Sequence, residues 1–206
     1  TGLRGLKKIG IMGGTFDPMH IGHLKIAVAA HEQFKLDKIL VMPSGNPSSY
    51  KDVSQLADAK DRCNIISMTI AGFPFLELSE MEIRRPGRTY TSDTLRILKR
   101  EYDLIYFIIG ADSLFSIDKW HEADFVMKNC RLLAANRDDI PDDTIYQRIA
   151  YLKNFYNAAV EVIDVPNLPY SSTEIRSRIK KRQSVSGMIT PDAQEYIFKR
   201  KLYLNN

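Results

Sequence analysis

Two kinds of apolar pattern alternate along the chain. Short apolar runs of four to seven residues, typical of buried strands, are separated by stretches in which apolar residues recur every three or four positions, as in amphipathic helices. The runs predict strands at residues 8–12, 38–42, 75–78, 104–110, 131–135 and 160–165. The periodic stretches predict helices at residues 22–34, 59–71, 91–100, 144–156, 172–181 and 191–203.

This alternation predicts an α/β fold. Successive strand–helix–strand units favour a parallel sheet with helices on both faces, so we expect a Rossmann-like, doubly wound arrangement. A chain of 206 residues is long enough to bury one full core. We interpret residues 1–206 as a single domain in which residues 171–206 form a small helical C-terminal subregion. The longest irregular stretch, residues 44–58, has the length of a loop that covers a ligand.

The composition is that of an ordinary globular protein with a small positive excess. A net charge of +4, from 29 basic and 25 acidic residues, suits an anionic ligand but does not indicate nucleic acid. Cys63 and Cys130 form no C-x-x-C pair, and we interpret both as buried, reduced thiols. No apolar stretch approaches the ~18 residues of a membrane span, and the first residues do not resemble a signal peptide. We therefore expect a cytoplasmic protein without a membrane partner.

The first candidate site lies where the first predicted strand meets the first predicted helix. Gly13 and Gly14 carry no β-carbon, so the backbone N–H groups of Gly13, Gly14, Thr15 and Phe16 can approach an anion near a helix N-terminus. The segment lacks the Gly-Lys-Ser/Thr of a Walker loop and the third glycine of the dinucleotide fingerprint. It is interpreted as a phosphate-binding turn of another type.

Two histidines follow this turn. His20 and His23 are three residues apart at the predicted start of a helix, so both imidazoles lie on one helix face and can point at one phosphate. Imidazole N–H groups can stabilise the charge that grows on a phosphate under attack. The alternatives are ordinary polar residues of a helix N-terminus or half of a metal site; we predict no metal ligands among them.

A second candidate site begins at the start of the helix predicted at residues 172–181. Ser171, Ser172 and Thr173 offer hydroxyl groups and backbone N–H groups there, and Arg176 adds a fixed positive charge. Taken alone, Ser-Ser-Thr-Glu is better explained as a helix capping box.

Together, the two segments resemble the signatures of a nucleotidyltransferase superfamily. Its members share Gly-Gly-Thr-Phe-Asp-Pro-x-His-x-Gly-His and, late in the chain, Ser-Ser-Thr-x-x-Arg/Lys, and they transfer AMP or CMP with loss of pyrophosphate. The resemblance implies the nucleotidyltransferase fold. It also implies catalytic roles for His20, His23 and Arg176. Of these, Arg176 is expected to contact the β- and γ-phosphates of ATP. The residues that the resemblance places against ATP are Gly13, Gly14, Thr15, Phe16, Ser171, Ser172 and Thr173.

Within the superfamily the chain is most similar to the bacterial nicotinate-nucleotide adenylyltransferases. Residues 89–95 resemble that family's Ser-Tyr-Thr-x-Asp-Thr-Leu segment, which implies that Tyr90 and Thr91 seat the nicotinate carboxylate. The Gly-x-Asp-Ser segment implies that Gly110 and Asp112 lie against the ATP ribose. Other positions of the nicotinate site follow from the same resemblance: Trp120 stacks on the pyridine ring, and the N–H of His121 contacts the carboxylate. Burial alone is the alternative explanation of Trp120.

One segment departs from this family's pattern. After the second strand the family carries Pro-Pro-His-Lys/Arg, whereas residues 46–51 read Asn-Pro-Ser-Ser-Tyr-Lys, one residue longer and without the histidine. We expect Lys51 to contact an ATP phosphate in its place.

The resemblance implies adenylyl transfer from ATP to nicotinate mononucleotide, with Mg²⁺ carried by ATP and no dedicated metal ligands. Nicotinamide mononucleotide and phosphopantetheine remain alternative acceptors. A non-catalytic nucleotide- or RNA-binding protein, using the basic clusters at residues 180–182 and 199–201, is the alternative outside enzymes. The sequence leaves the oligomeric state open, a homo-oligomer included.

Overall fold

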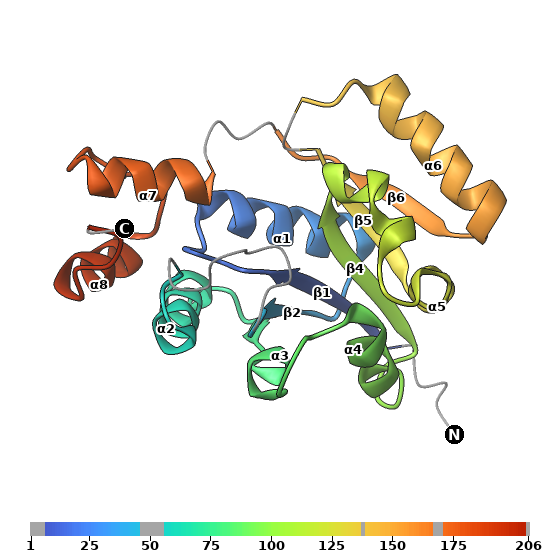
Figure 1. Cartoon of the computed structure of the whole chain (residues 1–206), viewed down its shortest axis with the longest axis horizontal. Helices are drawn as coiled ribbons and strands as arrows, with labels where there is room; N and C mark the ends of the chain where they lie inside the picture. The colour runs from blue at the N-terminus through green and yellow to red at the C-terminus, as the bar shows by residue number, and fades with distance from the viewer. Residues whose placement is uncertain (1–6, 46–55, 137–138, 167–170, 205–206) are drawn as a thin grey trace.

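Six parallel strands form one sheet in the order β3-β2-β1-β4-β5-β6 in a computed structural model of the chain (Figure 1). The structure describes residues 7–45, 56–136, 139–166 and 171–204. The strands are β1 (Lys8–Gly14), β2 (Lys38–Pro43), β3 (Leu76–Leu78), β4 (Leu104–Gly110), β5 (Arg131–Ala135) and β6 (Ala159–Ile163). The order reverses between β1 and β4, and in open α/β sheets such a switch point is where ligands bind.

The strands are apolar because side chains from both of their faces are buried. Alternate residues of β4 point to opposite sides: Tyr106 and Ile108 belong to one apolar cluster, whereas Ile105, Phe107 and Ile109 belong to the other. A parallel sheet covered on both faces needs such continuous apolar runs. The prediction of a doubly wound α/β fold is confirmed.

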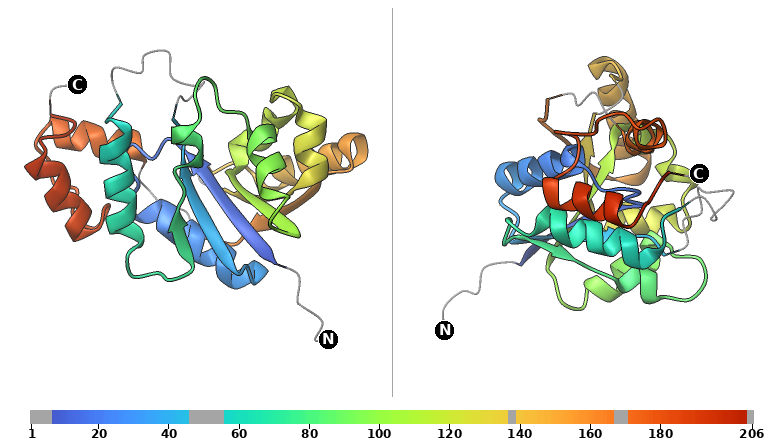
Figure 2. Two further views of the ribbon diagram at one scale, coloured as in Figure 1. Left: turned by 90° about the horizontal axis from the view of Figure 1, so that it is seen from below. Right: turned by 90° about the vertical axis from the view of Figure 1, so that its left-hand side faces the viewer.

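Two groups of helices cover these faces (Figure 2). The cluster that contains Ile108 is completed by α1 (Ile21–Phe34), α2 (Ala59–Ile70), α7 (Ser172–Lys180) and α8 (Pro191–Lys199). The cluster on the other face is completed by α4 (Thr91–Leu98), α5 (Ala123–Asn129) and α6 (Asp142–Tyr156). The C-terminal helices therefore share their apolar cluster with α1 and α2.

Helix α8 is held against α2 by polar contacts as well (Figure 2). The buried carboxylate of Asp61 accepts hydrogen bonds from the Tyr196 hydroxyl at 2.6 Å and from Arg200 Nε at 3.1 Å. Burial opposes the ionisation of Asp61, but the bonds from Arg200 and Tyr196 outweigh it and hold its pKa below the ordinary value. The C-terminal subregion is thus fastened to the first residues of α2.

The structure corrects several predicted boundaries. The helix predicted at residues 191–203 ends at Lys199, because Lys201 and Tyr203 adopt left-handed backbone conformations that turn the chain back on itself. Four short elements were not predicted: α3 (Met81–Arg84), α5, and the 3₁₀ helices η2 (Ala111–Phe115) and η3 (Ile117–Lys119).

The two cysteines lie in the core, as expected. Both cysteines are buried and free, and burial raises the pKa of Cys130 to about 12. No helix in the described part of the chain is long and apolar enough to cross a membrane.

Candidate active site

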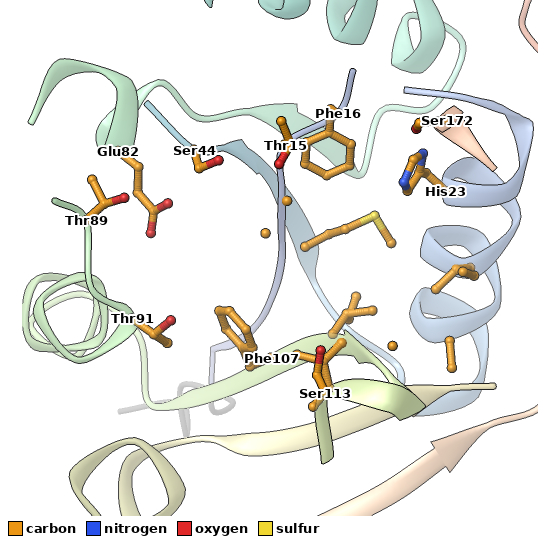
Figure 3. A pocket seen from close by; sticks show the side chains of 18 of the residues that line it. Thr15, Phe16, His23, Ser44, Glu82, Thr89, Thr91, Phe107, Ser113 and Ser172 are labelled. Carbon is orange, nitrogen blue, oxygen red and sulfur yellow. The ribbon is translucent and has the colours of Figure 1, made fainter. Parts of the chain in front are cut away.

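A cavity of about 530 Å³ opens at the carboxyl ends of β1 and β4, at the switch point of the sheet (Figure 3). Two ends can be distinguished in it. At the histidine end lie Phe16, His23 and Ser172; at the threonine end lie Glu82, Thr89 and Thr91. Thr15, Ser44, Phe107 and Ser113 lie between them in the same view. The two ends differ in the chemistry that they offer.

Gly13 and Gly14 matter for the space that they leave in the cavity, because neither has an unusual backbone conformation. Gly13 and Gly14 are the last residues of β1, so the strand extends two residues beyond the prediction and the turn begins at Thr15. A β-carbon on Gly13 would lie 3.5 Å from Phe107 Cζ, and one on Gly14 would lie 3.5 Å from the Phe16 ring. Within the turn, Phe16 takes the left-handed conformation (φ 52°).

The two histidines begin helix α1 and cap it reciprocally. His20 is the N-cap residue, and its Nδ1 accepts the Gly22 N–H at 3.0 Å; His23 Nδ1 accepts the His20 N–H at 3.1 Å. A neutral imidazole that accepts through Nδ1 carries its proton on Nε2, so both rings are fixed as Nε2 donors. The ring centroids are 3.9 Å apart. His23 lines the cavity, and His20 lies buried behind it.

Residues from the C-terminal subregion support the turn from outside. Arg176 donates from Nη1 to the carbonyl oxygen of Asp17 at 2.7 Å, and the Ser172 hydroxyl donates to the carbonyl oxygen of Pro18 at 2.9 Å. The Tyr203 hydroxyl donates to the buried Asp17 carboxylate at 2.7 Å. Burial, and then the nearby Asp17 charge, raise the pKa of Tyr203 far above its ordinary value, so the hydroxyl remains a donor. Segments 150 residues apart therefore meet at one turn.

The threonine end contains the aromatic residue that the sequence predicted. Trp120 lines the cavity and packs edge-to-face on Phe107, with ring centroids 6.1 Å apart. Tyr90 is the N-cap residue of α4, and its ring stacks on that of His121 at 4.1 Å. Because Tyr90 precedes Thr91 and His121 follows Trp120, this stacked pair holds the two cavity-lining residues near each other.

The predicted residues divide into those that line the cavity and those that do not. The first group is Gly13, Gly14, Thr15, Phe16, His23, Thr91, Gly110, Trp120 and Ser172. The second group is His20, Tyr90, Asp112, His121, Ser171, Thr173 and Arg176. In this structure the Ser171 side chain caps α7 by accepting the Glu174 N–H at 3.2 Å. Lys51 lies outside the described residues.

Several cavity-lining residues were not predicted. Ser44 follows the end of β2, next to β1, and its place at the carboxyl edge of the sheet was the signal that could have identified it. Glu82 lies on the short helix α3 and accepts a hydrogen bond from the Thr94 hydroxyl at 2.9 Å. Burial raises the pKa of Glu82, against the opposing effects of Thr94 and Arg85.

Side chains that could bind a metal ion are scattered over the described residues. Among residues 7–45, 56–136, 139–166 and 171–204, no three His, Cys, Asp or Glu side chains come together in a geometry suited to a metal ion. Cavity-lining carboxylates are contributed by Asp17 and Glu82, which belong to different elements.

Comparison with known proteins identifies the family. Residues 11–178 match the cytidylyltransferase-like family model. A probable nicotinate-nucleotide adenylyltransferase of Lachnoclostridium phytofermentans is 41% identical over 97% of this chain and 100% of its own length. This chain belongs to the nicotinate-nucleotide adenylyltransferase family. A second family member, from Thermoanaerobacter sp., is 37% identical over 95% of this chain and 94% of its own. The resemblance that the two signature motifs indicated is confirmed.

A solved structure supports the same fold. The Plasmodium falciparum nicotinic acid mononucleotide adenylyltransferase complexed with NaAD superposes with a TM-score of 0.79, covering 97% of this chain and 98% of that one at 23% identity. The superposition thus supports the same fold over nearly the whole chain.

Proposed function

We propose that this protein transfers the adenylyl group of ATP to nicotinate mononucleotide, giving nicotinate adenine dinucleotide and pyrophosphate in NAD biosynthesis. The observation that carries the proposal is the capped histidine pair at the edge of a cavity with two chemically different ends. Full-length identity of 41% to a probable nicotinate-nucleotide adenylyltransferase supports the choice of acceptor.

In the proposed reaction, a phosphate oxygen of nicotinate mononucleotide attacks the α-phosphorus of ATP. The new P–O bond forms as the bond to the β-phosphate oxygen breaks, and pyrophosphate leaves with that electron pair. The attacking phosphate monoester is already ionised at neutral pH, so the protein need not remove a proton. Catalysis then consists of alignment and of stabilising negative charge.

The histidine end of the cavity supplies that stabilisation in the proposal. His23 Nε2–H donates to a non-bridging oxygen of the α-phosphate, and His20 fixes the His23 ring and adds a second Nε2 donor close by. Their tautomers are set by the backbone bonds to Nδ1. Arg176 takes the β- and γ-phosphates, where its guanidinium, 24% exposed, lies beside the turn. A Mg²⁺ ion arrives with the triphosphate and neutralises part of its charge.

The threonine end receives the acceptor. The pyridine ring stacks on Trp120, and the nicotinate carboxylate takes N–H donors from Thr91, at the N-terminus of α4, and from His121. Gly110 and Asp112 lie against the ATP ribose at the end of β4. These roles follow from the family resemblance and agree with the cavity lining at Thr91, Trp120 and Gly110.

Pyrophosphate release tests the proposal. The enzyme is incubated with ATP, Mg²⁺ and one acceptor at a time: nicotinate mononucleotide, nicotinamide mononucleotide or phosphopantetheine. We expect release to be fastest with nicotinate mononucleotide, and His23→Ala to lower kcat by about 10²–10³-fold, the loss found when one charge-stabilising donor is removed.

The controls separate chemistry from folding. His31 lies on the same helix, stacked on Phe75 outside the cavity lining, so His31→Ala should leave kcat within about twofold of wild type. Faster release with nicotinamide mononucleotide or phosphopantetheine would reassign the acceptor. Release with none of the three, or normal turnover in His23→Ala, would overturn the proposed reaction.

A further inference from the structure

Arg62 is the one lysine or arginine that is buried within the described part of the chain, with 2% of its surface exposed. It lies in the first turn of α2, on the helix face that also buries Ile65 and Ile66. Its side-chain hydrogen bonds to described residues go to backbone carbonyl oxygens: Nη1 donates to Thr15 and to Ser44, both at 2.9 Å, and Nε donates to Ala57 at 3.1 Å.

Two of these carbonyl groups belong to cavity-lining residues that directly follow two neighbouring strands. The paired part of β1 and β2 ends at Gly14 and Pro43, and the Ser44 N–H still reaches the Gly14 carbonyl oxygen at 2.9 Å. Thr15 and Ser44 are the first residues beyond that pairing, and both line the cavity (Figure 3). Arg62 Nη1 therefore connects the two chain segments just beyond the last hydrogen bond between β1 and β2.

The third contact connects the same group to the Asp17 turn. Ala57, whose carbonyl oxygen accepts from Arg62 Nε, donates its own N–H to Asp17 Oδ1 at 3.1 Å. Asp17 in turn accepts from Tyr203, and its carbonyl oxygen accepts from Arg176. The guanidinium thus forms the centre of a hydrogen-bonded group that includes both ends of the Thr15–Asp17 turn.

The positive charge of Arg62 is buried without a carboxylate partner among the described residues. None of the ion pairs within the described residues includes Arg62, whereas the adjacent Asp61 pairs with Arg200. Burying a cation against carbonyl dipoles alone stabilises a fold less than an apolar side chain of the same volume would. A positive charge beside a turn that faces an anion, however, raises the affinity of that site for phosphate.

We propose that Arg62 is a positioning residue for the triphosphate: it sets the separation of Thr15 and Ser44 and places a buried positive charge behind the phosphate-facing turn. A lysine could supply the charge but not the planar set of donors that reaches three carbonyl groups. The proposal rests on the proposed function for the place of ATP at this turn, but it does not depend on the identity of the acceptor, because triphosphate binding can be measured without one.

The test compares Arg62→Lys and Arg62→Met with Arg200→Gln, all in the full chain. Arg200→Gln removes the neighbouring ion pair to Asp61 and loosens α2 from α8 without contacting the turn. Each protein is assayed at 10 °C for kcat, for the KM of ATP and for the Kd of a non-hydrolysable ATP analogue measured by calorimetry, and its folding is followed by circular dichroism.

We expect Arg62→Met to weaken the analogue about tenfold or more and to lower kcat about a hundredfold, the loss typical of an ångström-scale misplacement. Arg62→Lys should recover most of the analogue affinity while kcat remains low, because charge is restored but geometry is not. Arg200→Gln should lower Tm yet leave both quantities within about twofold of wild type.

Two results would overturn the proposal. One is that both Arg62 variants fold and keep kcat and analogue affinity near wild type. The other is that neither folds at 10 °C while Arg200→Gln does, which would assign Arg62 to folding alone. If wild type releases no pyrophosphate with any acceptor but the analogue affinity still falls in Arg62→Met, the proposed reaction fails and the role of Arg62 stands.

Discussion

The histidine end and the threonine end of the cavity are built from different kinds of contact. At the histidine end, Tyr203 and Asp17 form a hydrogen bond between side chains that are 5% and 2% exposed. At the threonine end, the Tyr90–His121 stack is flanked by an ion pair between Arg96 and Glu122, whose side chains are 42% and 38% exposed. One end depends on buried, charge-assisted bonds and the other on contacts open to water.

In the proposed function, this difference corresponds to different tasks. Transfer of a phosphoryl-type group depends on alignment to a fraction of an ångström. Several buried hydrogen bonds from distant parts of the chain restrict the turn to one position, as such alignment requires. Recognition of the acceptor base tolerates more variation, because stacking and backbone donors can be retained while surrounding side chains change. We therefore expect substitutions at the two ends to affect different quantities.

The largest effect on stability is expected from Tyr203→Phe. Removing the hydroxyl leaves the buried Asp17 carboxylate without one of its donors, which should lower the free energy of unfolding by about 2 kcal/mol. For a chain of this size that corresponds to a fall in Tm of about 4–8 °C. Scanning calorimetry measures it. Because the turn is also less constrained, kcat/KM for ATP should fall by about tenfold.

The matched control for Tyr203→Phe is Tyr146→Phe, the same chemical change at a residue of α6 that is 59% exposed. Its Tm should agree with wild type to within about 1 °C. Equal Tm values for the two variants would show that the hydrogen bond between Asp17 and Tyr203 adds no measurable stability at the histidine end.

An intermediate effect, confined to one substrate, is expected from Trp120→Ala. Loss of a stacking surface of this kind weakens base binding by about 1–3 kcal/mol, or about 5- to 150-fold in the KM of the acceptor mononucleotide. The KM of ATP should stay within about twofold of wild type. Steady-state kinetics with each substrate varied separately measures both values, and Trp120→Phe, which keeps an aromatic ring, should recover most of the loss. A parallel rise in both KM values would remove the distinction between the two ends.

Much of the fold was predictable because burial imposes continuous apolar runs on the strands. Strands β4 and β5 begin and end at the predicted residues. The elements that were missed, α3 and α5 among them, have three to seven residues, too few to establish a helical period. The end of α8 was placed too far along the chain because Tyr203 is apolar in pattern but turns inward to reach Asp17.

The site was predictable where its residues are neighbours in sequence. His20 and His23 could be assigned to one face because the helix between them fixes their separation. Arg62 and Glu82 could not, since each reaches the site through packing between elements distant in the chain. The reciprocal capping that selects the histidine tautomers could not be predicted either, because it depends on the angle at which the turn enters α1.

The smallest effect is expected from Glu122→Gln, at the exposed threonine end. Its hydrogen bonds to Arg96, at 2.7 Å, hold the pKa of Glu122 at about 2, below the ordinary carboxyl value. A lowered folded-state pKa stabilises the fold above the unfolded-state value of about 4.3, and that stabilisation is lost as the pH falls towards about 2. Tm measured from pH 6 downwards should therefore be slightly lower for Glu122→Gln than for wild type, and the two curves should converge in acid.

Glu195→Gln, on the exposed side of α8, should show no such convergence. A constant difference between the Glu122→Gln and wild-type curves across the whole range would mean that the stabilisation does not come from the charge on Glu122.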